Sequence, residues 1–210
     1  MRAKTELNQI LRGKKLILAS SSPRRAEILR KQRIDFETIC PHNMDEEKIS
    51  ADPVVHVLEL SRKKVQSVLH KVQEGLILGA DTIVVLNGEI LGKPKDRAHA
   101  QGILRKLSGK THRVYTGLTL MDKRSGKISS DHDCTEVTFN ELDEEDIKDY
   151  IATGEPMDKA GAYGIQGMGS FLVDRIRGNL DNVIGLPMQK FRQILKTITD
   201  TTIAEKSHNK

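Results

Sequence analysis

The apolar run at residues 76–86 is the feature that most constrains the fold. It is shorter than the roughly 20 residues that a transmembrane helix needs. It ends at Asn87-Gly88, the dipeptide that favours a type I′ hairpin turn, so a strand ends there and the chain reverses into residues 89–91. Because strand and helix patterns alternate on both sides of this hairpin, the sequence predicts an α/β fold with helices covering a sheet.

Periodicity and turn residues place the other elements. The stretch at 53–72 carries apolar residues at the three-and-four spacing of an amphipathic helix. Other helices are predicted at 23–31, 98–107 and 144–152, with a last helix that opens at 185–187 and ends near 198. Further strands are predicted at 16–20, 34–40, 114–121 and 134–139, and a glycine-rich loop at 161–169.

Length and composition limit the class of protein. The 210 residues fit one domain, taken as 15–198, with an N-terminal extension at 1–14 and a polar tail at 199–210 that is expected to be disordered. The 30% of charged residues and the charged N-terminus oppose a membrane span or a signal peptide, so a cytoplasmic protein is expected. Aromatic residues make up only 3%, which argues against stable binding of nucleic acid by base stacking.

The two cysteines give no sign of a disulfide or a zinc site. Cys40 and Cys134 lack the CxxC spacing of metal and redox motifs. We expect free thiols that are buried or half-buried.

The strongest local signal is a strand that runs directly into a helix at Ser22. Ser22 takes the N-cap position and Pro23 the first helical position, a pairing that helix starts prefer. Arg24 and Arg25 are unfavourable in a first turn, by about 0.3–1 kcal/mol each, unless an anion offsets them. The segment therefore predicts a phosphate site with Ser20, Ser22, Arg24 and Arg25 as ligands. The alternative is that both arginines only point into water.

Asp81 places a carboxylate inside the apolar strand. Burial of such a charge is costly unless it is paired, hydrogen-bonded or bound to a metal, and it favours a group that can take a proton from water. The alternative is an aspartate bonded to nearby backbone amides. The sequence position alone does not separate the two.

Two lysines extend the cationic set. Lys64 follows Val57 by seven residues and precedes Val68 by four, which puts it on or beside the apolar face of its helix. Lys93 lies in the constrained turn Gly92-Lys93-Pro94 after the hairpin. Each could also be a surface lysine whose stem covers apolar atoms. If both converge with Arg24 and Arg25, they offset most of the charge of a triphosphate, roughly −4.

Three further residues are weaker candidates. Glu46, in an acidic loop, could hold a divalent cation or could simply be solvated. Gln166 lies in the glycine-rich loop, where a side-chain amide can donate and accept at once and so read a pyrimidine edge. His112 fits a structural hydrogen bonder, because the histidines show no zinc-ligand spacing. The chain has no GxxxxGK[ST] motif, which disfavours ordinary ATPase or GTPase chemistry.

Taken together, these motifs resemble the Maf family of nucleotide pyrophosphatases from about residue 15 to 198. The resemblance rests on several motifs in the right order: Ala19-Ser20-Ser21-Ser22-Pro23-Arg24-Arg25, Gly79-Ala80-Asp81-Thr82, Gly92-Lys93-Pro94, Leu107-Ser108-Gly109, Thr116-Gly117, the stretch from Gly154 to Gly167, and Gly185-Leu186-Pro187. The resemblance implies a mixed, twisted sheet flanked by helices, as in inosine triphosphate pyrophosphatases, with a cleft between two lobes. It also implies a divalent cation, Mg²⁺ first and Mn²⁺ or Co²⁺ as alternatives, and a homodimer.

The resemblance also implies roles for single residues. Asp81 would be the general base for water and a metal ligand, with Glu46 as a metal or water partner. Arg24, Arg25, Lys64 and Lys93 would bind phosphates. Arg24, Thr82 and Gln166 match the branch of the family that acts on dTTP and UTP.

The implied reaction is hydrolysis of dTTP or UTP to the nucleoside monophosphate and pyrophosphate. Mg²⁺ would bridge phosphate oxygens while Asp81 takes a proton from the water that attacks the α-phosphorus. One alternative is the same chemistry on 7-methyl-GTP or another modified nucleotide. An alternative of a different class is a division regulator or nucleic-acid-binding module.

Overall fold

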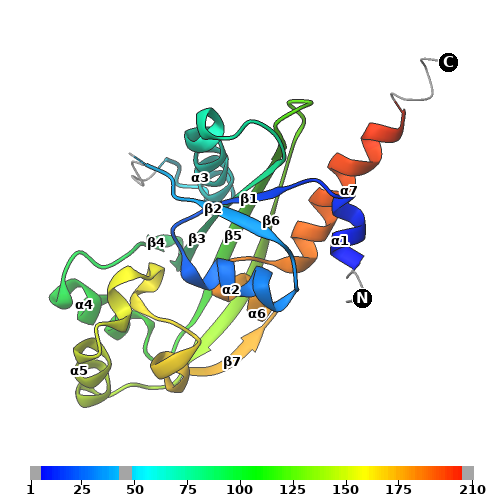
Figure 1. Ribbon diagram of the computed structural model, residues 1–210. Helices are drawn as coiled ribbons and strands as arrows, with labels where there is room; N and C mark the ends of the chain where they lie inside the picture. The colour runs from blue at the N-terminus through cyan, green and yellow to red at the C-terminus, as the bar shows by residue number, and fades with distance from the viewer. Residues whose placement is uncertain (1–5, 43–48, 205–210) are drawn as a thin grey trace.

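The computed structural model describes residues 6–42 and 49–204 (Figure 1). Its α-helices are α1 (Glu6–Leu11), α2 (Pro23–Lys31), α3 (Pro53–Val68), α4 (Arg97–Leu107), α5 (Glu144–Ala152), α6 (Leu180–Ile184) and α7 (Met188–Ala204). Its strands are β1 (Leu16–Ala19), β2 (Phe36–Ile39), β3 (Leu76–Leu86), β4 (Glu89–Leu91), β5 (Thr111–Asp122), β6 (Ile128–Phe139) and β7 (Val173–Arg177). Short 3₁₀ turns are η1 (Leu69–Lys71), η2 (Glu155–Asp158), η3 (Ala160–Ala162) and η4 (Gly167–Leu172).

The described strands form one mixed sheet in the order β2-β1-β3-β5-β6-β7, with β4 paired to β3 beside this path. β1 runs parallel to β2 and β3, whereas β3, β5, β6 and β7 alternate in direction. Asn87 and Gly88 have φ angles of 50° and 82°, the positive pair that a type I′ turn requires, so the predicted hairpin between β3 and β4 is confirmed.

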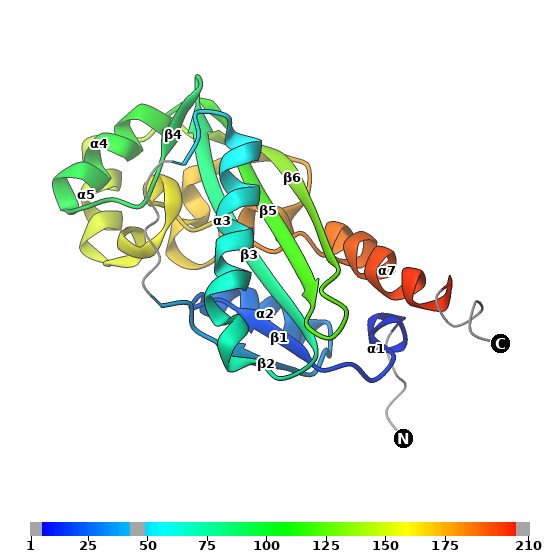
Figure 2. The ribbon, with the colours of Figure 1, turned by 90° about the horizontal axis from the view of Figure 1, so that it is seen from above.

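Side-chain alternation along β1 divides the main core into two layers. Leu16 and Leu18 join the cluster closed by α1, α2 and α7, while Ile17 and Ala19 join the cluster under α3. α3 therefore lies on one face of the sheet and α2 on the other, as the two views of the ribbon show (Figures 1 and 2).

A second lobe is built on the far end of β3. Val84 and Leu86 belong to a separate cluster with apolar residues of α4, α5 and η3. In Figure 1, α4 and α5 lie at the opposite end of the molecule from α7. The predicted α/β class, with a mixed sheet flanked by helices in two lobes, is confirmed.

Several predicted boundaries differ from the structure. β6 begins at Ile128 and not at residue 134, because its polar first half pairs with β5 in a long hairpin. The loop predicted at 161–169 contains parts of η3 and η4, and β7 follows it without having been predicted.

Helices lie at both ends of the predicted domain. α7 extends to Ala204, past the predicted end of the last helix near residue 198. The hydroxyl of Thr199 donates to the Leu195 carbonyl at 2.9 Å, and Thr199 is buried. The segment described as an extension contains α1, whose Leu7 and Leu11 enter the core that α7 closes.

Two surface features complete the fold. Cys40 and Cys134 are free, as predicted, but both are exposed and not buried, because one follows the edge strand β2 and the other lies on a solvent-facing position of β6.

Among the described helices, none combines the length and the hydropathy of a membrane-spanning segment.

Candidate active site

A cavity of about 720 Å³ opens where β1 ends beside β3. β1 pairs with β3 only as far as Gly79, and β4 begins to pair with β3 at Val84. Between these points β3 runs on, and its residues Asp81 and Thr82 line the cavity. The chain leaves β1 through α2 on one face and reaches β3 through α3 on the other. Such crevices, at the carboxyl ends of parallel strands where the connections diverge, are the usual binding sites of α/β sheets.

Lys64 and Asp81 meet in the wall of this cavity. The Lys64 Nζ donates to Asp81 Oδ1 at 2.6 Å, and the two side chains are only 9% and 8% exposed. Asp81 is therefore paired with a cation, and not with the backbone amides that the alternative reading required. The bond engages Oδ1, so Oδ2 can still accept a proton or a ligand.

Two glycines bring α3 close enough to the sheet for this contact. A Cβ added at Gly79 would lie 2.3 Å from the Ser61 carbonyl oxygen, and one added at Gly117 would lie 2.5 Å from that of Val57. Both carbonyls belong to α3, so the helix backbone rests directly on β3 and β5. The close approach places Lys64, one turn further along α3, beside Asp81.

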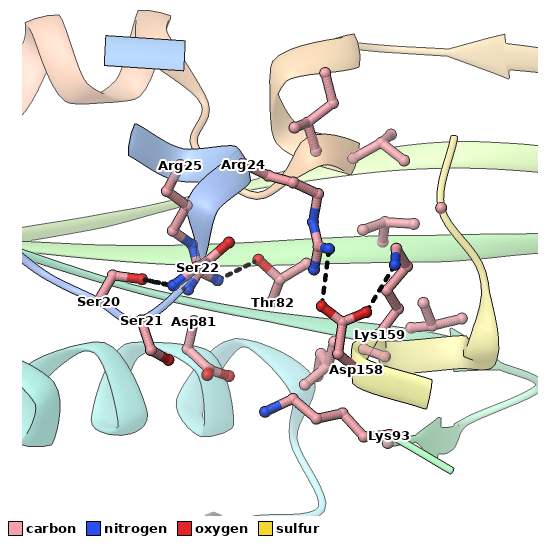
Figure 3. Close-up of a pocket in the computed structure, with 18 of the residues that line it drawn as sticks. Ser20, Ser21, Ser22, Arg24, Arg25, Asp81, Thr82, Lys93, Asp158 and Lys159 are labelled. Carbon is pink, nitrogen blue, oxygen red and sulfur yellow. Dashed lines mark hydrogen bonds and ion pairs between the residues drawn. The ribbon is translucent and has the colours of Figure 1, made fainter. Parts of the chain in front are cut away.

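Arg25 joins three separate elements at the base of the cavity. Its Nε donates to the Gly185 carbonyl at 2.8 Å. Nη2 donates to Thr82 Oγ1 at 3.0 Å and Nη1 to Ser20 Oγ at 3.3 Å (Figure 3). Gly185 ends α6, Thr82 lies on β3, and Ser20 follows β1. A guanidinium can serve three acceptors in this way because its N–H groups form a planar fork.

The first turn of α2 lines the same cavity. Ser22 has the extended backbone of an N-cap residue, and Pro23 is the first helical residue, as predicted. Within the described residues, no side chain caps this turn and no acidic residue lies in it. Ser21, Ser22 and Arg24 line the cavity, so an anion placed there would lie beside the backbone amides of the first turn and the positive end of the helix dipole.

Arg24 crosses the cleft to the second lobe. Its Nη1 lies 3.1 Å from Asp158 Oδ2, and Lys159 Nζ lies 2.7 Å from Asp158 Oδ1. Burial raises the pKa of Asp158, but the hydrogen bond from Lys159 and the charge of Arg24 outweigh it and hold that pKa below its usual range. The carboxylate is therefore ionised between its two cations.

The structure brings nearly all of the predicted site residues into one cavity. The lining includes Ser20, Ser22, Arg24, Arg25, Lys64, Asp81, Thr82, Lys93 and Gln166. Glu46 lies outside the described residues, so its predicted role has no structural counterpart here. His112 is a buried hydrogen bonder, as predicted: its Nε2 lies 2.8 Å from Tyr163 Oη.

Sequence reasoning assigned no role to several residues that line the cavity. Asp158, Lys159, Tyr163, His56 and Ser21 are the polar members of this set. The first three belong to the stretch at 154–167 that carries the family resemblance. Its glycines and short 3₁₀ turns give no periodic pattern, so the sequence does not predict which side chains face the cavity. For His56 the position at the start of α3, one residue before buried Val57, was the available signal.

A divalent cation fits this donor set only together with a phosphate ligand. The described residues contain no cluster of three or more His, Cys, Asp or Glu side chains that could hold a metal ion. Mg²⁺ commonly uses one or two carboxylates and takes its other ligands from substrate phosphates and water. The Asp81 carboxylate, at the cavity wall, fits the part of a single protein ligand.

Comparison with known proteins gives consistent matches over most of the chain. The family described as Maf-like protein matches residues 15–198. A dTTP/UTP pyrophosphatase of Clostridium tetani is 46% identical over 184 residues, which cover 86% of this chain and 95% of that protein. A dTTP/UTP pyrophosphatase of Aquifex aeolicus is also 46% identical over 184 residues, covering 88% and 95%. Among solved structures, a nucleoside-triphosphatase (dITP/XTP pyrophosphatase) of Mycobacterium abscessus aligns with a TM-score of 0.43 at 14% identity, over 90% of this chain and 97% of that one.

Proposed function

This chain belongs to the Maf family, and from that premise we propose that it is a nucleoside triphosphate pyrophosphatase that hydrolyses dTTP and UTP to the monophosphate and pyrophosphate. The observation that carries the proposal is the gathering of one buried carboxylate and cations from distant parts of the chain around a single cavity. A polyphosphate needs such a cationic enclosure, and its hydrolysis needs a base for water.

Asp81 is the proposed general base. Lys64 fixes its Oδ1, which orients the carboxylate and leaves Oδ2 to take a proton from water. The water oxygen then forms a bond to the α-phosphorus, and the bridging P–O bond to the β-phosphate breaks. Pyrophosphate leaves with the electron pair of that bond.

The cations are proposed to hold the phosphates. The amides at the start of α2 are proposed to bind the anionic tail, together with Lys93, which lines the same cavity from the turn after β4. Arg25 is proposed to bind the phosphates of the nucleotide. Its bonds to Ser20 and Thr82 fix the position of its guanidinium. Because these groups are held by the fold before a nucleotide arrives, little reorganisation is needed as charge moves onto the leaving group.

A divalent cation, Mg²⁺ first, is proposed to bind with the nucleotide. It would be held by Asp81, with Glu46 as a second proposed partner, and would supply charge neutralisation on the phosphate oxygens. The polar residues of the cavity would then need to offset only part of the triphosphate charge.

The choice of dTTP and UTP is proposed to depend on Arg24, Thr82 and Gln166. All three line the cavity, from α2, from β3 and from the residue that precedes η4. The relatives named as dTTP/UTP pyrophosphatases support the pyrimidine assignment. We further propose that the enzyme works in the cytoplasm, where these nucleotides are made and used, and as a homodimer.

The decisive experiment is a nucleotide panel. Purified protein with Mg²⁺ is given dTTP, UTP, CTP and 7-methyl-GTP, and the products are identified as monophosphate with pyrophosphate or as diphosphate with phosphate. The proposal predicts pyrophosphate release with dTTP and UTP preferred. Preference for 7-methyl-GTP would replace the substrate assignment, and no metal-dependent hydrolysis together with salt-sensitive DNA binding would replace the enzyme assignment.

A further inference from the structure

Asp158 links two cations that come from opposite sides of the cleft. Arg24 belongs to α2 in the first lobe, and Lys159 lies between η2 and η3 in the second. Figure 3 shows both side chains reaching the Asp158 carboxylate, with Ser20, Ser21 and Asp81 on the other side of the view. The three residues, called here the cleft triad, therefore lie apart from the end of the cavity that holds the proposed base.

The second lobe holds Lys159 firmly. Its Nζ donates to the Glu155 carbonyl at 2.5 Å as well as to Asp158, and its side chain is 12% exposed. A Cβ added at Gly164 would lie 2.8 Å from the Lys159 Cε, so the lysine stem packs against the backbone that leads to Gln166. An ammonium has three N–H donors, and these two bonds leave the third for a ligand in the cavity.

The cleft triad presents a fixed order of hydrogen-bonding groups. Arg24 and Lys159 carry only donors, and the ionised Asp158 carries only acceptors, each oxygen having a second lone pair beyond the one it uses here. The bond to Asp158 uses one of the five N–H donors of Arg24. Read across the cleft, the order is donor, acceptor, donor.

That order is complementary to one class of base. The edge of uracil or thymine presents a carbonyl oxygen, an N–H and a second carbonyl oxygen, which is acceptor, donor, acceptor. Cytosine has an amino donor in place of the first carbonyl and a bare nitrogen in place of the N–H. Guanine has an amino donor in place of the second carbonyl. Each of these bases would set a donor against a donor or an acceptor against an acceptor.

We propose that Asp158 and Lys159, together with Arg24, form the surface that recognises the uracil or thymine edge, and are further specificity-determining residues. The inference deepens the proposed function and rests on it. Asp158 accepts the N3–H of the base and holds its two cations in place to donate to the carbonyl oxygens. Arg24, on the side of α2, donates to O2, the carbonyl beside the ribose, and Lys159 donates to O4, which cytosine replaces with an amino group. The triphosphate then extends toward α2 and Asp81.

The test compares kcat/KM for UTP, CTP and N3-methyl-UTP, measured by pyrophosphate release, in the wild type and in variants. Lys159→Met and Asp158→Asn should lower the ratio of UTP to CTP by roughly 10- to 100-fold, because each removes a charged hydrogen bond made only to the correct base. Lys159→Arg, which keeps a donor, should restore part of the ratio. In the wild type, N3-methyl-UTP should be a poor substrate, and Asp158→Asn should lose much of that discrimination.

Two control variants change the same residue types outside the cavity. Lys106→Met removes an ion pair with Glu89, and Asp131→Asn removes one with Lys190; both should leave the ratios unchanged. Asp158 is 62% exposed in its side chain, so its substitution should not unfold the protein, which thermal unfolding would verify.

The possible outcomes are distinct. Three results would overturn the inference and leave the pyrophosphatase assignment intact. They are an equal loss of kcat/KM on all nucleotides in the variants, an unchanged ratio of UTP to CTP, and a wild type that hydrolyses N3-methyl-UTP as well as UTP. A wild-type protein that hydrolyses neither UTP nor dTTP would overturn the proposed function, and this inference with it.

Discussion

The Lys64 ammonium lies 2.6 Å from the Asp81 carboxylate, and the two side chains are less than a tenth exposed. Desolvation of both charges is costly, and the attraction between the two charges offsets that cost. A structural pair could lie anywhere in the core, but this one lies in the wall of the cavity of about 720 Å³, which the first turn of α2 also lines. Its position therefore favours a catalytic role over a purely structural one.

Asp81→Asn should separate binding from chemistry. The carboxamide keeps the shape of the side chain but cannot take a proton from water, so kcat should fall by roughly 10² to 10⁴. Nucleotide affinity, measured by calorimetry in EDTA so that neither the metal contact of Asp81 nor turnover contributes, should change only a few-fold. Asp131→Asn, which lies outside the cavity, is the matched control and should keep full activity. Near-normal kcat in Asp81→Asn would remove this residue from the role of base.

Gly79→Ala should show that the site depends on the close approach of α3. The added methyl group would meet the Ser61 carbonyl, a backbone atom that can move only with the helix. We expect the free energy of unfolding to fall by about 1–3 kcal/mol, and kcat to fall as Lys64 shifts from Asp81.

Gly102→Ala is the control for that substitution. Gly102 lies in α4, and apart from its chain neighbours and the backbone of its own helix, no atom of the described structure lies within 4 Å of a Cβ added there. Alanine is the better helix former, so the free energy of unfolding should rise by up to about 1 kcal/mol with no change in kcat. If Gly79→Ala and Gly102→Ala lowered the free energy of unfolding and kcat by similar amounts, the effect at Gly79 would not come from its contact with α3.

Arg25→Lys should lower both stability and nucleotide binding. One ammonium cannot reach three acceptors on three elements, so at least two of the bonds to Ser20, Thr82 and Gly185 are lost. At about 1 kcal/mol for each bond, the loss is roughly 2 kcal/mol, to be measured by urea unfolding. KM for UTP should rise in parallel. The same exchange at the exposed Arg62 should have little effect, and an unaffected KM in Arg25→Lys would argue that the three bonds do not shape the site.

Local patterns in the sequence were sufficient to predict those parts of the site that lie within a single helix, strand or turn. The start of α2 follows from Ser22 and Pro23, and the hairpin after β3 follows from Asn87-Gly88, because caps and turns depend on a few adjacent residues. Asp81 stood out because a charge in an apolar strand must have a partner. The partner itself, Lys64, could only be suggested from its helix face.

Contacts that bring distant segments together were beyond such patterns. Arg24 and Asp158 are 134 positions apart, and nothing near either residue specifies the other. The first half of β6 is polar and gains its strand conformation from pairing with β5, so no apolar alternation marked it. The length of α7 was missed for a related reason: the helix continues past Ile198 with threonines, whose helix propensity is poor.

Acidification should destabilise the protein through His112. Burial lowers the pKa of His112 from 6.5 to about 4, and within the described residues its Nδ1 has no hydrogen-bond partner. Between these two pKa values the unfolded chain takes up a proton that the folded chain refuses. The free energy of unfolding is therefore unaffected above about pH 6.5 and falls as the pH drops toward 4, by at most about 1.4 kcal/mol per pH unit.

His112→Gln tests this assignment. Glutamine can keep a hydrogen bond to the Tyr163 hydroxyl but does not titrate, so its free energy of unfolding should depend less steeply on pH in that interval than the wild type's. Urea unfolding at a series of pH values gives both slopes. Equal slopes would assign the acid sensitivity to other groups.

Chelation of divalent cations should abolish activity without unfolding the protein. The described residues hold no cluster of three metal ligands, so the metal is expected to bind with the nucleotide and not to support the fold. With EDTA, pyrophosphate release from UTP should stop, while the midpoint of thermal unfolding of the nucleotide-free protein should stay the same. By linkage, Mg²⁺ should raise that midpoint only when a nucleotide is present. A large shift with Mg²⁺ alone would point instead to a preformed metal site, for which the segment at 43–48 that contains Glu46 would be the first place to look.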